Sequence, residues 1–145
     1  MNKKLIIITT FLTCISTSIY ASPTITFNIA NYTDKTFTLF GWYNMYCYNA
    51  PSYPNTIGGI NTSGPGTVVI SYKANCGNSQ GGIEYAVYGT SSFTSTIFKV
   101  YFSYNSQTDT WTQSFGHSSD LNVVPFTDPL PPHATSSTIG VDIPQ

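Results

Sequence analysis

The sequence predicts an all-β protein: a single antiparallel β-sandwich of jelly-roll outline that follows a signal peptide. Short stretches of alternating apolar and polar residues recur along the chain, and turns rich in Gly, Asn, Ser and Pro separate them. No stretch places apolar residues at the spacing of a useful amphipathic helix. Successive strands without helices are typical of two sheets packed face to face.

Residues 1–21 predict a secretory signal peptide. They begin with two lysines, continue with an apolar core diluted by Thr and Ser, and end at Ala21, which is small enough to precede a cleavage site. A lipoprotein would need a cleavage motif ending at Cys14, and the residues before it fit that motif poorly. We therefore expect residues 22–145 to form one exported domain, outside the cell or in the periplasm.

Eight stretches have the pattern of β-strands. In the first, Ile25, Phe27 and Ile29 fall on one face and polar residues fall on the other, as in a half-buried strand. In the fifth and strongest, Phe98 and Phe102 share an apolar face. The expected strands, in order, span residues 24–31, 36–43, 67–72, 82–88, 94–104, 110–115, 121–126 and 138–143.

Three connections between these strands are informative. Residues 44–63 form a long irregular segment with several prolines and glycines, which makes it a candidate functional loop. Residues 105–109 predict a five-residue hairpin loop. Residues 128–132 contain three prolines and predict a rigid connector, because such a segment cannot be a central strand.

Two cysteines, Cys47 and Cys76, remain after the expected cleavage. An even number of cysteines in an exported chain favours a disulfide. A bridge across this spacing stabilises the fold by about 3.5 kcal/mol in the chain-entropy description. Metal binding is disfavoured because no histidine spacing accompanies the two cysteines. We therefore expect a Cys47–Cys76 disulfide, and neither a metal ion nor a cofactor.

The charges exclude one class of partner. The expected exported chain has three lysines, six acidic residues and no arginine, for a net charge of −3. Nucleic-acid binding needs clustered cations that release counterions, so we expect no nucleic-acid partner. Attachment to anionic lipid is disfavoured for the same reason. The chain instead contains 11 Tyr, 9 Phe and 2 Trp, whose rings fill a core or form a neutral surface.

No group of residues predicts catalysis. His117, Ser118 and Asp120 are triad residue types, but they fall within one turn, which is not the geometry of a triad. A metal site built from His117, Asp120, Asp128 and His133 would have no recognised ligand spacing. Paired carboxylates for glycoside hydrolysis would require two scattered acidic residues to meet. We therefore expect a binding protein and not an enzyme.

The candidate ligand-binding residues are aromatic and surround the start of the long connection. They are Trp42, Tyr43, Tyr46, Tyr48 and Tyr53. This density predicts a neutral aromatic surface for an uncharged ligand, such as a glycan or a zwitterionic lipid headgroup. The alternative is that most of these rings pack against the end of a sheet beneath the disulfide.

Short motifs in the first two-thirds of the chain are similar, in their order, to those of one known family. They are IANYT at residues 29–33, GPGT at 64–67, ANCG at 74–77 and GGIEYAVY at 81–88. A later hairpin, from residue 99 to residue 115, and a short final strand follow in the same order. In these features the chain resembles the aegerolysins. The resemblance covers most of the expected domain in layout, and residues 64–89 in detail.

The resemblance implies a small β-sandwich that binds membrane lipid. Some members of that family act with a separate pore-forming protein, so a haemolysin-like system with such a partner is one expectation. Trp42 falls near the tryptophan that follows the second strand in that family, so the resemblance implies that it contacts the membrane. We therefore expect a secreted lipid-binding protein. A lectin-like carbohydrate-binding module and an adhesion or structural subunit that presents strand edges remain the alternatives.

Overall fold

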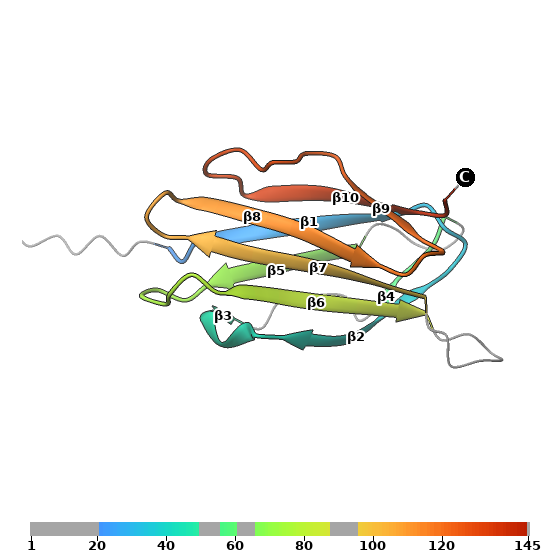
Figure 1. Cartoon of the computed structure of the whole chain (residues 1–145), viewed down its shortest axis with the longest axis horizontal. Helices are drawn as coiled ribbons and strands as arrows, with labels where there is room; N and C mark the ends of the chain where they lie inside the picture. Colours follow the sequence, from blue (N-terminus) through green and yellow to red (C-terminus); the bar gives the residue numbers. More distant parts are fainter. Residues whose placement is uncertain (1–20, 50–55, 61–65, 88–95, 145) are drawn as a thin grey trace, which may run out of the picture.

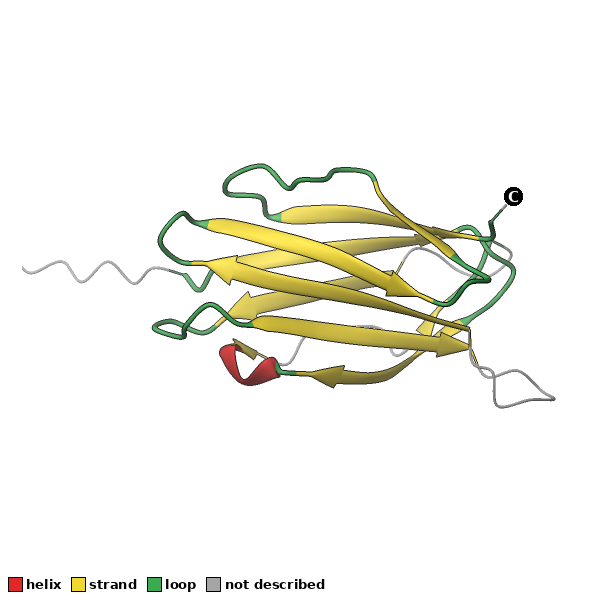
Figure 2. Ribbon diagram, in the orientation of Figure 1, coloured by secondary structure: helices red, strands yellow, loops and turns green. Residues whose placement is uncertain are grey.

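The structure is a computed structural model that describes residues 21–49, 56–60, 66–87 and 96–144. The described chain forms two five-stranded sheets packed face to face as one sandwich (Figures 1 and 2), which confirms the predicted all-β class. The elements are β1 (Thr24–Asn31), β2 (Phe37–Tyr43), the 3₁₀ turn η1 (Met45–Cys47), β3 (Tyr48–Asn49), β4 (Thr56–Ile57), β5 (Gly66–Tyr72), β6 (Gln80–Val87), β7 (Thr96–Asn105), β8 (Thr110–His117), β9 (Asn122–Pro125) and β10 (Ser136–Asp142).

The two sheets interleave segments that are distant in the sequence. Sheet A has the strand order β3-β5-β1-β10-β9, and sheet B has the order β4-β2-β6-β7-β8. The β1–β10 pair is parallel, with Thr26 beside Ser136 and Asn31 beside Val141. The other pairs are antiparallel, as predicted for the whole sandwich. A parallel pair needs a long connection, and here nearly the whole domain connects β1 to β10.

All eight predicted strands are present, and their bounds agree with the prediction to within two residues. Two very short strands, β3 and β4, lie in the connection that the sequence left irregular. Residues 1–20 of the predicted signal peptide, which spans residues 1–21, lie outside the described residues, and the signal peptide remains a prediction. Tyr53 also lies outside the described residues.

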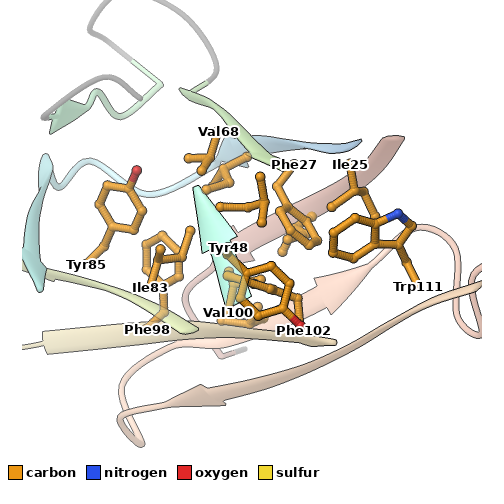
Figure 3. Close-up of a cluster of buried hydrophobic side chains, with 14 of the residues drawn as sticks. Ile25, Phe27, Tyr48, Val68, Ile83, Tyr85, Phe98, Val100, Phe102 and Trp111 are labelled. Carbon is orange, nitrogen blue, oxygen red and sulfur yellow. The ribbon is translucent and has the colours of Figure 1, made fainter. Parts of the chain in front are cut away.

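The core lies between the sheets and is built from the apolar faces of the alternating strands. Ile25, Phe27 and Ile29 of β1 are fully buried, as their alternation predicted. The ring of Phe27 in sheet A lies 5.9 Å from that of Phe102 in sheet B, and Phe102 in turn lies 5.0 Å from Tyr48. Figure 3 shows these rings turned toward one another between the sheets. Contacts across the core therefore fix how the sheets stack.

A disulfide braces one end of the sandwich, called here the disulfide end. Cys47 and Cys76 are bonded, with Cα atoms 5.5 Å apart, which confirms the predicted bridge. The Lys73 amide donates to the Cys47 carbonyl at 2.9 Å, and the Asn44 side chain donates to the Gln80 carbonyl at 2.6 Å. These bonds fix η1 and β3 against the connection between β5 and β6.

Side-chain hydrogen bonds brace the opposite end of the sandwich. Asp120 accepts from the hydroxyls of Thr96 and Ser118, the latter at 2.6 Å, and pairs with Lys35 at 3.3 Å. The two hydroxyl bonds, Ser118 first, lower the pKa of Asp120 to about 2. His117, the third triad residue type, contacts the carbonyl oxygen of Ser118 at 3.0 Å. Ser118 and Asp120 thus join the start of β7 to the turn after β8.

Candidate functional site

The structure divides the predicted aromatic residues between the surface and the core. Trp42 is 53 % exposed and Tyr46 is 67 % exposed, while Tyr48 is only 1 % exposed. Tyr43 is half-buried. A third exposed ring, Phe40 at 59 %, lies two residues before Trp42. We call Phe40, Trp42 and Tyr46 the aromatic edge.

A β-bulge in β2 lies at the first ring of the aromatic edge. Leu39 pairs with Tyr85 of β6, and the next paired residue is Gly41, opposite Glu84, so Phe40 is the extra residue. A bulge of this kind bends the strand and changes which way its side chains point. Within the described residues, the pairing of β4 covers only the start of β2. Phe40 and Trp42 therefore project from a border strand of sheet B.

Tyr46 is held by the disulfide end. It is the middle residue of η1, and its neighbour Cys47 is fixed by the disulfide. The Lys73 ammonium donates to the backbone carbonyl of Tyr46 at 2.9 Å. Because η1 is tied on both sides, the exposed Tyr46 ring is presented from a fixed backbone. A surface that is ordered in advance loses less entropy on binding a ligand.

Tyr43 lies on the outer face of sheet B, beside Tyr101. Its ring covers Gly82, where an added Cβ atom would come within 2.2 Å of that ring. The rings of Tyr43 and Tyr101 meet edge to face, 5.5 Å apart. Burial, reinforced by Tyr101, raises the pKa of Tyr43. The phenol of Tyr43 therefore stays neutral and serves as packing surface on this face.

An ion pair lies on the same outer face. Glu84 and Lys99 are opposite each other in the β6–β7 register, and their charged atoms are 2.8 Å apart. The hydrogen bond from Lys99 to Glu84 raises the pKa of Lys99. The only glutamate in the sequence thus has a cross-strand partner, as is common on a partly solvated sheet face.

Tyr48 belongs to the core. Its position at the start of β3, paired with Tyr72, turns its ring between the sheets. The hydroxyl donates to the Ser79 carbonyl and accepts from the Tyr104 amide at 3.3 Å, so its polar atom is satisfied. Burial raises its pKa. A ring with so little exposed surface cannot contact a ligand. For Tyr48, the alternative that the ring packs in the protein is therefore the correct one.

A second group of exposed apolar side chains lies on the outer face of sheet A. Tyr32, Val124 and Phe126 are 48 %, 48 % and 61 % exposed. All three residues have atoms within 4 Å of the Cβ position of Gly140. The alternation in β9 contained a signal for this group, because it places Val124 opposite to the buried Val123. The sequence analysis did not identify it.

Neither a metal site nor a membrane helix is found in the described part of the chain. No three His, Cys, Asp or Glu side chains in residues 21–49, 56–60, 66–87 and 96–144 are grouped to hold a metal ion. In the same ranges, no helix has the length and apolarity needed to cross a bilayer. The candidate site is therefore described by its surface chemistry alone. No known family model matches this chain, and no curated protein is significantly similar to it.

Proposed function

We propose that this is an exported, non-enzymatic protein that recognises neutral membrane lipid through the aromatic edge. The observation that carries the proposal is the exposure of Phe40, Trp42 and Tyr46, each by more than half, on one strand border and the adjoining turn. The same function is implied by the resemblance to aegerolysins. The disulfide is consistent with an exported protein.

The residue types of the aromatic edge suit the boundary of a bilayer. Trp and Tyr rings are enriched where lipid headgroups meet hydrocarbon, because each ring is apolar with one polar atom. Phe40 supplies apolar surface that gains about 25 cal/mol for each Å² removed from water. The net charge of the exported chain is negative, so attraction to anionic lipid does not contribute. We therefore expect binding that depends little on salt.

Co-sedimentation with vesicles tests this proposal. The oxidised protein, without its signal peptide, is mixed with phosphatidylcholine vesicles, with and without sphingomyelin and sterol, at low and high salt. We expect lipid-selective binding that persists at high salt. Trp42→Ala should weaken binding about tenfold or more, since it removes the largest side chain that the aromatic edge would bury against the lipid.

A matched pair of phenylalanines locates the site. Phe40 and Phe126 have nearly equal exposure, but Phe40 belongs to the aromatic edge and Phe126 to the outer face of sheet A. Phe40→Ala should weaken vesicle binding, and Phe126→Ala should leave it unchanged. A loss with Phe126→Ala alone would move the site to sheet A, and no binding to any mixture would reject lipid recognition.

The resemblance also implies that lipid recognition serves a separate pore-forming protein. Vesicles loaded with a fluorescent dye test this part of the proposal. We expect the protein to bind such vesicles without releasing the dye, since in this arrangement the partner makes the pore. Dye release by the protein alone would show that no partner is needed.

A further inference from the structure

A small pocket lies at the disulfide end and shares no residue with the aromatic edge. Its volume is about 270 Å³. It lies between the residues that begin β1, the loop of the β7–β8 hairpin and the segment that precedes β10. The lining residues used below are Ser22, Thr24, Asp109, Trp111, His133 and Thr135.

An aspartate and a histidine from two loops form the polar centre of the pocket. Asp109 accepts a hydrogen bond at Oδ1 from the Tyr104 hydroxyl, 2.6 Å away, and Oδ2 faces Nδ1 of His133. The His133 amide also donates to the Asp109 carbonyl at 3.2 Å. The Tyr104 bond, followed by the His133 bond, lowers the pKa of Asp109, so the carboxylate is ionised.

This arrangement determines which atoms of His133 remain for a ligand. Nδ1 faces a carboxylate, so it carries the proton and donates. Nε2 is then the ring atom left to exchange a hydrogen bond with a ligand. The hydroxyls of Ser22, Thr24 and Thr135 line the same pocket and can donate or accept. Trp111 lies beneath the pocket and is only 3 % exposed, so it supports the pocket from the core.

The backbone at both members of the pair is unusual. Asp109 has φ 50° and His133 has φ 59°, in the left-handed region that non-glycine residues rarely adopt. Such conformations cost free energy, and they cluster where a structure positions functional groups. The two loops thus hold the pair in place by a main-chain bond, a side-chain bond and an uncommon backbone.

The chemistry of the pocket excludes several ligands. Among the described residues that line it there is no lysine or arginine, and the carboxylate is negative, so an anion is disfavoured. A metal ion is disfavoured because the pair has no third ligand. The volume lies just below the range of about 300–1,000 Å³ typical of ligand sites, which leaves room for one ring and not for an extended chain.

We propose that this pocket binds a single neutral, polyhydroxylated ring: the terminal sugar of a free glycan or of a glycolipid headgroup. Ring hydroxyls would exchange hydrogen bonds with Nε2 of His133 and with the hydroxyls of Thr24 and Thr135. The proposal does not depend on lipid recognition by the aromatic edge.

Two-dimensional ¹H–¹⁵N NMR titration of the oxidised protein with neutral monosaccharides tests the proposal. We expect shifts centred on Thr24, His133 and Thr135, which are exposed residues of the pocket. His133→Asn removes the imidazole, and asparagine tolerates the left-handed backbone, so the fold is kept. This variant should weaken binding about tenfold, as loss of one ligand hydrogen bond predicts. His117→Asn is the matched control, since His117 is an exposed histidine outside the pocket, and its affinity should be unchanged.

A second variant removes a hydroxyl without changing the shape of the side chain. Thr135 is exposed, so Thr135→Val should not unfold the protein. It should also weaken sugar binding, with an unchanged melting temperature. Equal affinity of the Thr135→Val and His133→Asn variants with the parent protein would overturn the proposal.

The same sugar, offered either free or on a glycolipid, distinguishes the two possible sources of the ligand. Shifts at His133 with free sugar indicate a free glycan, and shifts seen only when the sugar is displayed on a glycolipid in nanodiscs indicate a membrane headgroup; both support the pocket. Shifts confined to Tyr43 and Tyr101 would overturn it in favour of the outer face of sheet B. If neither the free sugar nor the glycolipid produced shifts, the proposal would also be overturned, whatever the vesicle assay shows for Trp42→Ala.

Discussion

Tyr46 and Tyr48 are separated by one residue and have opposite environments. Tyr46 is the most exposed aromatic residue in the described chain, and Tyr48 is among the most buried. Between them Cys47 ends η1 and is fixed by the disulfide, and the chain changes there from a 3₁₀ turn to a strand paired with β5. The same residue type therefore serves packing at one position and surface chemistry at the next.

The comparison extends to the groups that these two tyrosines belong to. The buried group is an aromatic cluster at the disulfide end, in which Tyr48 packs near Tyr72, Phe102 and Trp111. The exposed group is the aromatic edge. Burial of large rings stabilises the fold, while exposed rings contribute little to it. Substitutions in the first group should thus change stability, and those in the second should change binding.

The largest expected effect is that of Tyr48→Ala. It removes a fully buried ring and leaves the Ser79 carbonyl and the Tyr104 amide without their side-chain partner. The free energy of unfolding should fall by about 3–5 kcal/mol, as for other large core truncations. Urea denaturation followed by tryptophan fluorescence measures this. A loss below about 1 kcal/mol would mean that the aromatic cluster does not carry the stability assigned to it.

Removal of the disulfide should have the next largest effect. The double variant Cys47→Ser with Cys76→Ser should lose about 3.5 kcal/mol, because the unfolded chain is no longer restrained across the 29-residue separation. It should also free the turn that presents Tyr46. Hydrogen exchange of the η1 amides is measured in the parent protein and in the double variant. Equal protection in both would show that the hydrogen bonds of Lys73 and Asn44 hold the turn without the disulfide.

A smaller effect is expected at the opposite end. Asp120→Asn removes the carboxylate that joins Thr96, Ser118 and Lys35. Because Asp120 and Lys35 are partly exposed, the loss should be about 1 kcal/mol at neutral pH. Thermal denaturation of the parent protein and of Asp120→Asn, measured over a range of pH, tests this prediction.

The pH dependence follows from the lowered pKa of Asp120. Its folded pKa of about 2 is below the ordinary 3.8, so its contribution to stability is complete above pH 3.8 and is lost as the pH falls toward 2. The difference in stability between the parent protein and Asp120→Asn should shrink over that interval. A constant difference from pH 5 to pH 2 would contradict the assigned hydrogen bonds.

The smallest expected effect on stability is that of Tyr46→Ala. Its ring is two-thirds exposed, and the bond from Lys73 goes to its backbone carbonyl, which the substitution retains. The free energy of unfolding should change by less than about 0.5 kcal/mol. The same denaturation assay as for Tyr48→Ala measures it, and a loss of similar size in both variants would erase the contrast between the two tyrosines.

Local patterns were sufficient to predict the strands and the disulfide. Alternation identified β1 with its bounds, because in a half-buried strand the polarity of each residue indicates which face of the sheet it lies on. Alternation does not report which strands pair, so the parallel β1–β10 contact was not anticipated. Alternation also fails where the backbone is irregular. The bulge at Phe40 and the 3₁₀ turn at Tyr46 interrupt the two-residue repeat, so the sequence pattern does not predict which way these side chains point.

The candidate sites show a similar limit. Aromatic density picked out a segment in which Trp42 and Tyr46 are exposed, but density alone does not separate Trp42 from the buried Tyr48. The pairing of Asp109 with His133 joins residues 24 positions apart in two loops, and loops carry no periodic signal. Contacts that depend on loop backbone conformation require the structure.

The parallel pairing of β1 and β10 has a practical consequence for attaching this protein to anything else. The first and last strands run in the same direction, so the chain enters the sandwich at the disulfide end and leaves it at the other (Figure 1). Ser22, beside the expected cleavage site, lines the pocket, so extra residues retained there would crowd it. A label, a fused domain or a solid support joined after Ile143 would instead leave the pocket and Tyr46 facing outward.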